Sequence, residues 1–151
     1  MLRNDLSRVC KPHSVEVAGL CNLESHMSVH HLVSIVTGEL SERQDAVTLL
    51  RACFPSDSIT GAPKVRSMEI ITEIERVARQ VYCAAIGFIG FNGHMDTNIA
   101  IRTVTIDGDQ AMFHTGGGIT AMSDPQAEYA EMLAKAQRIF EAFGAEVPGP
   151  L

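Results

Sequence analysis

The chain has 151 residues, of which 46% are apolar, which is enough for one domain with its own core. A net charge of −6 and an isoelectric point near 5.4 exclude a strongly basic nucleic-acid-binding surface, and tryptophan, a common base-stacking residue, is absent. No apolar run approaches the roughly 18 residues of a membrane-spanning helix, and the first residues lack the features of a secretory signal. The four cysteines never occur as CxxC, which predicts reduced thiols in a cytoplasmic protein.

The first third of the chain predicts short elements joined by turns. Residues 14–20 alternate as a short strand, and residues 28–40 place apolar side chains at helical spacing. A second helix is predicted from residue 41 to residue 53. It begins with the capping-box pattern Ser41-Glu42-Arg43-Gln44 and ends before Pro55.

The loop 56–64 carries three hydroxyl groups, a glycine and Lys64, and it leads into another helix. Free N–H groups at a helix start attract anions, and a lysine beside them would strengthen that attraction. An ordinary loop capped by serine and threonine is the alternative interpretation. In the helix that follows, we expect an inward face made of Val65, Met68, Ile71 and either Ile74 or Ile70.

From residue 82 the pattern changes to that of strands. Residues 82–92 are rich in small and β-favouring side chains, and residues 98–106 alternate between apolar and polar. Asp107-Gly108 predicts a hairpin turn into residues 110–114. Together these three strands predict an antiparallel meander.

Arg102 is the candidate binding residue of this meander. In a continuous strand it shares a face with Ala100 and Val104, which are small or apolar. An inward guanidinium is costly unless it meets an anion, so the pattern favours an anion-binding role. A structural ion pair is the alternative.

Three successive glycines, Gly116, Gly117 and Gly118, precede the last predicted helix. Without Cβ atoms, their N–H groups can converge on one anion. Ser123-Asp124-Pro125-Gln126 then predicts a helix start, with serine as the cap and proline at the first helical position.

On that helix Glu128, Glu131 and Lys135 fall within about 60° of one another. Two carboxylates one turn apart repel unless a cation lies between them, so they indicate a site for a metal ion and an anionic ligand. A solvated stripe with a surface Glu131–Lys135 pair is the alternative. A separate apolar stripe consists of Tyr129, Met132, Leu133, Ala136, Phe140 and Phe143.

Several stretches, in order along nearly the whole chain, resemble the chorismate-utilising enzymes. They are residues 29–34, 58–71, 95–103, 116–119 and 123–131. Within the family, Ser-Ile-Thr-Gly-Ala-Pro-Lys at 58–64, Gly-Gly-Gly-Ile and Ser-Asp-Pro look most like component I of aminodeoxychorismate synthase. Component I of anthranilate synthase, which serves tryptophan biosynthesis, is the alternative.

The resemblance implies an α/β (α+β) fold in which helices pack on an antiparallel sheet. Residues 1–144 correspond to the C-terminal half of a chorismate-binding catalytic domain, and residues 145–151 to a flexible tail. The implied reaction is amination of chorismate to 4-amino-4-deoxychorismate for p-aminobenzoate and folate biosynthesis. A glutamine amidotransferase subunit would supply the ammonia.

The resemblance also implies roles for individual residues. Glu131 would bind Mg²⁺ with support from Glu128, and the Mg²⁺ would hold the ring carboxylate of chorismate. His31 is placed near C4 and the pyruvyl end, where elimination takes place, and Thr60 in a loop that contacts the substrate. The groups that would hold or surround the pyruvyl carboxylate are Tyr82, Arg102, Gly116, Gly117, Gly118 and Lys135.

Two family features lie upstream of the part that the chain resembles. They are a first pair of Mg²⁺-binding glutamates and a Pro-Ile-Lys-Gly-Thr-like motif, whose lysine separates the aminodeoxychorismate enzymes from anthranilate synthase. We therefore expect the chain by itself to be inactive. The remaining alternatives are a truncated, non-catalytic product, favoured by a Met1 that stands inside an element, and an unrelated metal-binding regulatory domain.

Overall fold

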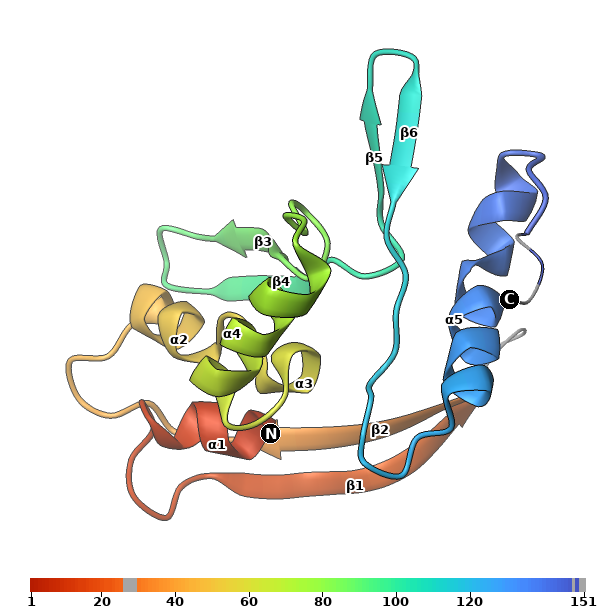
Figure 1. Ribbon diagram of the computed structural model, residues 1–151. Coiled ribbons are helices and arrows are strands. Elements are labelled where there is room, and N and C mark those ends of the chain that lie inside the picture. The colour runs from red at the N-terminus through yellow and green to blue at the C-terminus, as the bar shows by residue number, and fades with distance from the viewer. Residues whose placement is uncertain (26–29, 148, 150–151) are drawn as a thin grey trace. The chain divides into compact units, whose positions relative to one another are not determined.

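The computed structural model describes residues 1–25, 30–147 and 149 (Figure 1). These residues form two compact units, which we describe separately. The first comprises Met1–Arg76 and Gly87–Asp96, and the second comprises Val77–Ile86 and Thr97–Leu151. Residues 148, 150 and 151 of the expected tail lie outside the described residues.

The first unit contains a two-stranded antiparallel ribbon and four helices. The ribbon pairs β1 with β2 from Glu16 opposite Thr37 to Ser25 opposite His30, with irregularities near Gly19. Its elements are α1 (Leu2–Ser7), β1 (Glu16–Ser25), β2 (His30–Thr37), α2 (Ala46–Cys53), α3 (Asp57–Thr60) and α4 (Lys64–Glu75).

The helix predicted for residues 28–40 is wrong, because His30–Thr37 forms strand β2. Val33, Ile35 and Val36 are β-branched, and all three pair with residues of β1. Pairing across the ribbon therefore overrides a helical spacing that was also compatible with this short apolar run. Residues 28 and 29 lie outside the described residues.

Helix α2 ends where the sequence predicted but begins later. Asp45, not Ser41, is the cap: its carboxylate accepts from the Thr48 N–H at 2.9 Å, and the Thr48 hydroxyl accepts from the Asp45 N–H at 2.7 Å. The Ser41 N–H donates instead to the Val9 carbonyl at 2.9 Å. A capping box thus exists four residues beyond the predicted one.

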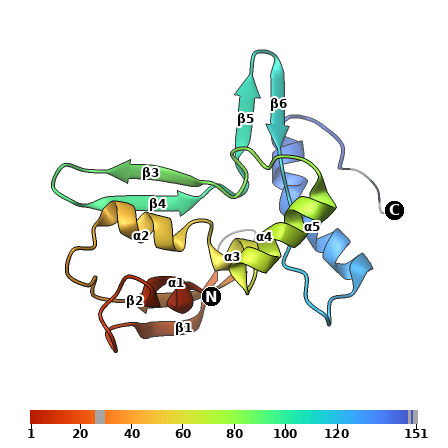
Figure 2. The same cartoon turned by 60° about the vertical axis from the view of Figure 1, so that its left-hand side comes forward.

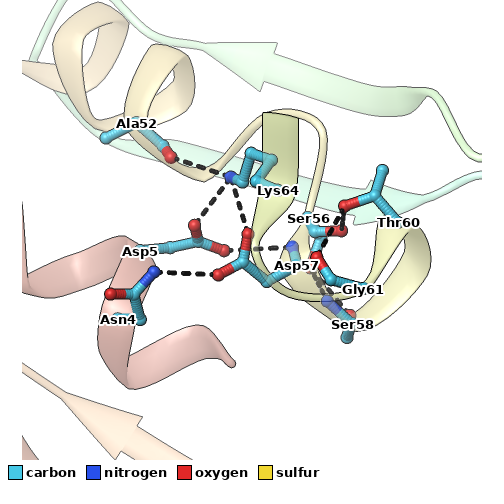
Figure 3. Close-up of polar contacts among 9 residues, drawn as sticks. All are labelled: Asn4, Asp5, Ala52, Ser56, Asp57, Ser58, Thr60, Gly61 and Lys64. Atoms are coloured by element: carbon cyan, nitrogen blue, oxygen red, sulfur yellow. Dashed lines mark hydrogen bonds and ion pairs between the residues drawn. The ribbon is translucent and has the colours of Figure 1, made fainter. Parts of the chain in front are cut away.

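A buried charged cluster joins three helices of the first unit (Figure 3). The Lys64 ammonium lies 2.6 Å from Asp5 Oδ1, 3.3 Å from Asp57 Oδ1 and 3.3 Å from the Ala52 carbonyl oxygen. Asn4 donates to Asp57 Oδ2 at 3.0 Å, and the Asp57 N–H donates to Asp5 Oδ2 at 3.2 Å. Asp5, Asp57 and Lys64 are 0%, 1% and 9% exposed, so this Asp5–Lys64–Asp57 cluster is closed to water.

The remaining elements are two hairpins and a long helix. They are β3 (Ala85–Ile89), β4 (Met95–Ile99), β5 (Val104–Asp107), β6 (Gln110–Phe113) and α5 (Pro125–Ala142). The predicted turn at Asp107-Gly108 is confirmed, because Asp107 pairs with Gln110 and Gly108 has a φ of +60°. Among the described residues β3 pairs with β4 and β5 with β6, so the predicted three-stranded meander is not formed.

The strand predicted for residues 98–106 is broken between β4 and β5. Ala100, which is 1% exposed, exchanges backbone hydrogen bonds with Cys83 and Ala84 at 2.9 and 2.8 Å. The Ile101 N–H turns back to the Ile99 carbonyl at 2.9 Å, and Arg102 has a φ of +51°. The chain therefore turns here, and Arg102 is exposed rather than inward as predicted.

Helix α5 has the predicted apolar stripe and proline, but a different cap. The Asp124 carboxylate accepts from the Ala127 N–H at 2.9 Å, in place of the expected Ser123. Figure 2 shows the extended backbone that leads from β6 to the start of α5. Ala136 is 1% exposed, and Phe140 packs edge-on against Phe113 of β6 at 5.2 Å between ring centres. The helix face predicted from periodicity is thus the face that packs against the hairpin strand.

The described residues bury few apolar side chains completely. Only Val9, Cys10, Ala100 and Ala136 are buried, whereas Val65 is 70% and Met68 40% exposed, contrary to the prediction for α4. On the β1–β2 ribbon the exposed apolar side chains are Val17, Leu20, Leu23, Leu32 and Ile35. The four cysteines are free, and no described helix is long and apolar enough to cross a membrane.

The cluster predicts a specific response to acid. Burial by itself would raise the pKa of Asp57, but the Asn4 amide and the Lys64 ammonium outweigh burial and hold that pKa below its ordinary value of 3.8. A carboxyl group whose pKa is lowered by folding stabilises the folded state. This stabilisation is fully present at pH values above the ordinary pKa, and it is lost as the pH falls through the lowered pKa. Asn4→Ala removes one lowering group, so we expect the acid-unfolding midpoint, followed by circular dichroism, to move to higher pH.

The control for this experiment is Asn98→Ala, which alters an exposed side chain on β4. We expect it to leave the midpoint in place. Equal midpoints for Asn4→Ala and the unaltered chain would contradict the role of Asn4 in holding the Asp57 carboxylate.

Candidate functional site

Several predicted site residues come together in the second unit, beside the first turns of α5. A Cβ atom added at Gly116 would lie 2.9 Å from the Tyr82 hydroxyl. A Cβ added at Gly117 would lie 3.3 Å from Glu128 Oε2 and 3.8 Å from the Lys135 ammonium. We call this group, together with Glu131, the glycine–helix site.

The glycines contribute to this site because side chains of other residues lie close to their backbone. None of the three has a φ in the left-handed region, so their backbone conformation alone does not require glycine. A methyl group at Gly116 would clash with the Tyr82 hydroxyl, and one at Gly117 would crowd the Glu128 carboxylate. At Gly118 a Cβ would meet nothing within 4 Å. A methyl group would therefore force a shift at Gly116, would crowd a flexible carboxylate at Gly117 and would meet nothing at Gly118.

The two carboxylates of the site have different partners. Glu128 Oε1 accepts a hydrogen bond from the Ser123 hydroxyl at 2.6 Å. Glu131, which has a 60% exposed side chain, pairs with the Lys135 ammonium at 2.6 Å. The hydrogen bond from Lys135, together with its positive charge, lowers the pKa of Glu131. The Glu131 carboxylate is therefore open to solvent or a ligand, whereas the Glu128 carboxylate is part-buried beside Ser123.

The Tyr82 ring is held by groups that the sequence analysis missed. It stacks on His114 with 5.4 Å between ring centres and 12° between planes, and the Arg79 guanidinium lies 5.7 Å from its centre. The Thr115 hydroxyl, next to His114, donates to the Met132 carbonyl at 3.2 Å. These contacts join residues far apart in the sequence, and neither periodicity nor a motif marks them.

The other predicted site residues lie elsewhere. Arg102 is in the turn between β4 and β5, in the second unit, and is exposed. His31 lies on β2 opposite Glu24, and Thr60 ends the short helix α3, both in the first unit. Lys64, which was expected to attract an anion, is instead paired internally with Asp5 and Asp57.

The acidic residues of α5 suit Mg²⁺ as part of a larger ligand set. Mg²⁺ prefers carboxylate oxygens and water, and Glu128 and Glu131 offer two carboxylates one helical turn apart. Within the part of the chain that the structure describes, no three His, Cys, Asp or Glu side chains gather as a metal site. The two glutamates therefore fit the cation as partial ligands, with the other positions left to water or substrate.

Comparison with known proteins gives consistent matches. A family model described as chorismate binding enzyme matches residues 1–141. The chain is 50% identical over 139 residues to aminodeoxychorismate synthase component 1 of Salmonella typhimurium, covering 92% of this chain and 31% of that protein. It is 43% identical over 143 residues to anthranilate synthase component 1 of Mycolicibacterium smegmatis, covering 95% of this chain and 27% of that protein.

The crystal structure of anthranilate synthase component I from Streptococcus pneumoniae has the same fold, with a TM-score of 0.82 and 39% identity. The match covers 89% of this chain and 31% of that one. The predicted fold class is therefore confirmed, as is the resemblance on which it was based. The chain spans less than a third of the length of these relatives.

The glycine contacts can be tested with matched substitutions. Gly116→Ala places a methyl group against the Tyr82 hydroxyl at 2.9 Å, which is closer than carbon and oxygen pack, so the ring must shift. We expect the NMR signals of the Tyr82 ring to move. Gly118→Ala is the control, because its methyl group meets nothing within 4 Å. Identical Tyr82 signals in both variants would contradict the close approach.

The Glu131–Lys135 pair predicts a titration shift. In Lys135→Gln the lowering group is gone, so the pKa of Glu131 should rise toward its ordinary value of 4.5. A ¹³C NMR titration of the Glu131 carboxyl group measures this directly. Lys11→Gln, which removes an exposed pair with Glu39, should leave the Glu131 pKa unchanged. An unchanged pKa in Lys135→Gln would show that the pair does not form in solution.

Proposed function

Since this chain belongs to the chorismate binding enzyme family, we propose that it forms the chorismate-holding part of an enzyme of the aminodeoxychorismate synthase component I type. The reaction is amination of chorismate to 4-amino-4-deoxychorismate, for p-aminobenzoate and folate biosynthesis. A glutamine amidotransferase subunit supplies the ammonia. The observation that carries the proposal is the glycine–helix site, where a hydroxyl, an ammonium and two carboxylates lie around closely approaching glycines.

The chemistry of the site suits a substrate with two carboxylates. The Tyr82 hydroxyl and the Lys135 ammonium are donors for one carboxylate, and the backbone at Gly116 and Gly117 is open to close approach. Glu128 and Glu131 would repel the other carboxylate by themselves. Mg²⁺ bound to them would supply the positive charge that holds and polarises that group.

The family resemblance supports roles for three further residues, each considered separately from the glycine–helix site. Arg102 is exposed, so its guanidinium is free of the burial cost that an inward position would carry, and it can pair with the pyruvyl carboxylate. Thr60 contributes a hydroxyl to the substrate-contacting loop. His31 acts as the proton-transferring residue near C4, because a ring nitrogen of imidazole can accept a proton in general-base catalysis.

The second candidate function is that of anthranilate synthase component I, which also eliminates pyruvate. The crystal structure from Streptococcus pneumoniae supports it as an alternative. Identity of 50% to the Salmonella aminodeoxychorismate synthase, against 43% and 47% to the anthranilate synthases of Mycolicibacterium and Synechocystis, slightly favours the aminating function.

The four cysteines are free, which supports a reducing compartment, and we assign the protein to the cytoplasm.

A chimera tests the proposal. Residues 1–141 replace the corresponding segment of the Salmonella relative, and the purified chimera receives chorismate, Mg²⁺ and ammonia. Chromatographic detection of 4-amino-4-deoxychorismate is the expected result, whereas anthranilate and pyruvate would favour the second candidate. A folded chimera that leaves chorismate unchanged would contradict both functions.

Arg102→Ala in the chimera tests substrate binding. Loss of a charged hydrogen-bonding partner for a carboxylate should lower kcat/KM for chorismate by at least about thirtyfold, or ~2 kcal/mol. Arg138→Ala is the matched control, because Arg138 is an exposed arginine paired with Glu141 on α5. A kcat/KM equal to that of the control would remove Arg102 from the binding site.

A further inference from the structure

We propose that the buried Asp5–Lys64–Asp57 cluster is a positioning device for Thr60, holding the segment Ser56–Gly61 at both of its ends. The inference rests on the proposed function, in which Thr60 contacts the substrate. None of the three charged residues touches the substrate in this proposal, so each acts through the loop (Figure 3).

The segment that carries Thr60 is too short to keep a stable conformation without contacts to the rest of the unit. Helix α3 has four residues, only about one turn, and such short helices are unstable in isolation. Within it the Thr60 N–H and hydroxyl both donate to the Ser56 carbonyl, at 3.0 and 3.2 Å, and the Gly61 N–H donates to the Asp57 carbonyl at 2.9 Å. The direction of the Thr60 hydroxyl therefore follows from the placement of Ser56 and Asp57.

The cluster fixes that placement from two sides. Asp57 is the first residue of α3, and both its carboxylate and its N–H are bound by α1, through Asn4 and Asp5. Lys64 is the first residue of α4 and binds the same two carboxylates. The segment is thus clamped three residues before Thr60 and four residues after it.

Burial makes this clamp specific. The Lys64 ammonium has three N–H donors, and its three neighbours are Asp5, Asp57 and the Ala52 carbonyl. Asp57 Oδ1 has no well-aligned hydrogen bond among the described residues, so its ion pair with Lys64 is what offsets its burial. A shift of the loop by one residue would leave a charge buried without a partner, which is strongly disfavoured.

The first measurement is hydrogen exchange of the whole chain. In Lys64→Met, we expect the Thr60 and Gly61 amides to exchange at least about tenfold faster, because a charged anchor is lost. Asp57→Asn keeps the side-chain shape and an acceptor for Asn4, so it provides a variant that folds if Lys64→Met does not. Lys11→Met, which removes an exposed pair with Glu39, is the control, and exchange on the β1–β2 ribbon reports global unfolding.

The second measurement is a double-mutant cycle in the chimera. Asp57→Asn should raise KM for chorismate by about tenfold while leaving the exchange of the ribbon unchanged. In a Thr60→Ala background the same substitution should have little further effect, because Thr60 is the group through which the cluster acts. A purely structural role would give equal losses in both backgrounds.

Two outcomes overturn the inference alone. One is unchanged exchange of the Thr60 and Gly61 amides in Asp57→Asn, and the other is an equal loss of kcat/KM with and without Thr60. An unaltered chimera that folds but does not convert chorismate would overturn the proposed function, and the positioning role would fall with it.

Discussion

Burial of the Lys64 ammonium between two carboxylates is the interaction on which the first unit depends. The cluster joins α1 to α3 across 52 residues of sequence and α1 to α4 across 59 residues, which local hydrogen bonds cannot do. Removing one partner of a buried ion pair costs about 3–5 kcal/mol, whereas exposed pairs such as Arg66–Glu69 contribute about 1 kcal/mol or less. Among the described residues of this unit, Val9 and Cys10 are the only buried apolar side chains, so the charged cluster defines how its helices meet.

The second unit contains a lysine–glutamate pair that is exposed rather than buried. Lys135 and Glu131 lie 2.6 Å apart, but their side chains are 31% and 60% exposed. An exposed pair can exchange partners at little cost, so the same two groups can turn to a substrate carboxylate and a cation. Buried charges fix a structure and exposed charges can bind a ligand. The difference in burial therefore separates the positioning cluster from the glycine–helix site.

The features that could be predicted correctly are those that depend on residues close together in the sequence or on family resemblance. Helices α4 and α5, the β5–β6 hairpin and the fold class follow from such signals, and all are confirmed. The predictions that were wrong concern residues whose partners are distant in the sequence. Residues 30–37 form a strand because β1 pairs with them. The strand predicted through Arg102 is broken because the Ala100 N–H donates to the Ala84 carbonyl. The prediction that Lys64 attracts an anion was made from its place at a helix start. Its pairing with Asp5 was missed because no spacing rule connects the two residues. A periodic pattern identifies an apolar face but not what covers it.

The role proposed for the glycine–helix site concerns how chorismate would be held, and it says less about which product would form. The carboxylate recognition that we propose for Tyr82, Lys135 and a cation on Glu131 would serve amination alone and amination with loss of pyruvate equally well. Product choice must come from groups that act where bonds break, and these need precise placement more than charge. Within the described residues, His31 and Thr60 are the two proposed near that region. In this proposal, a buried cluster that fixes the Thr60 segment would bear on product choice as well as on affinity.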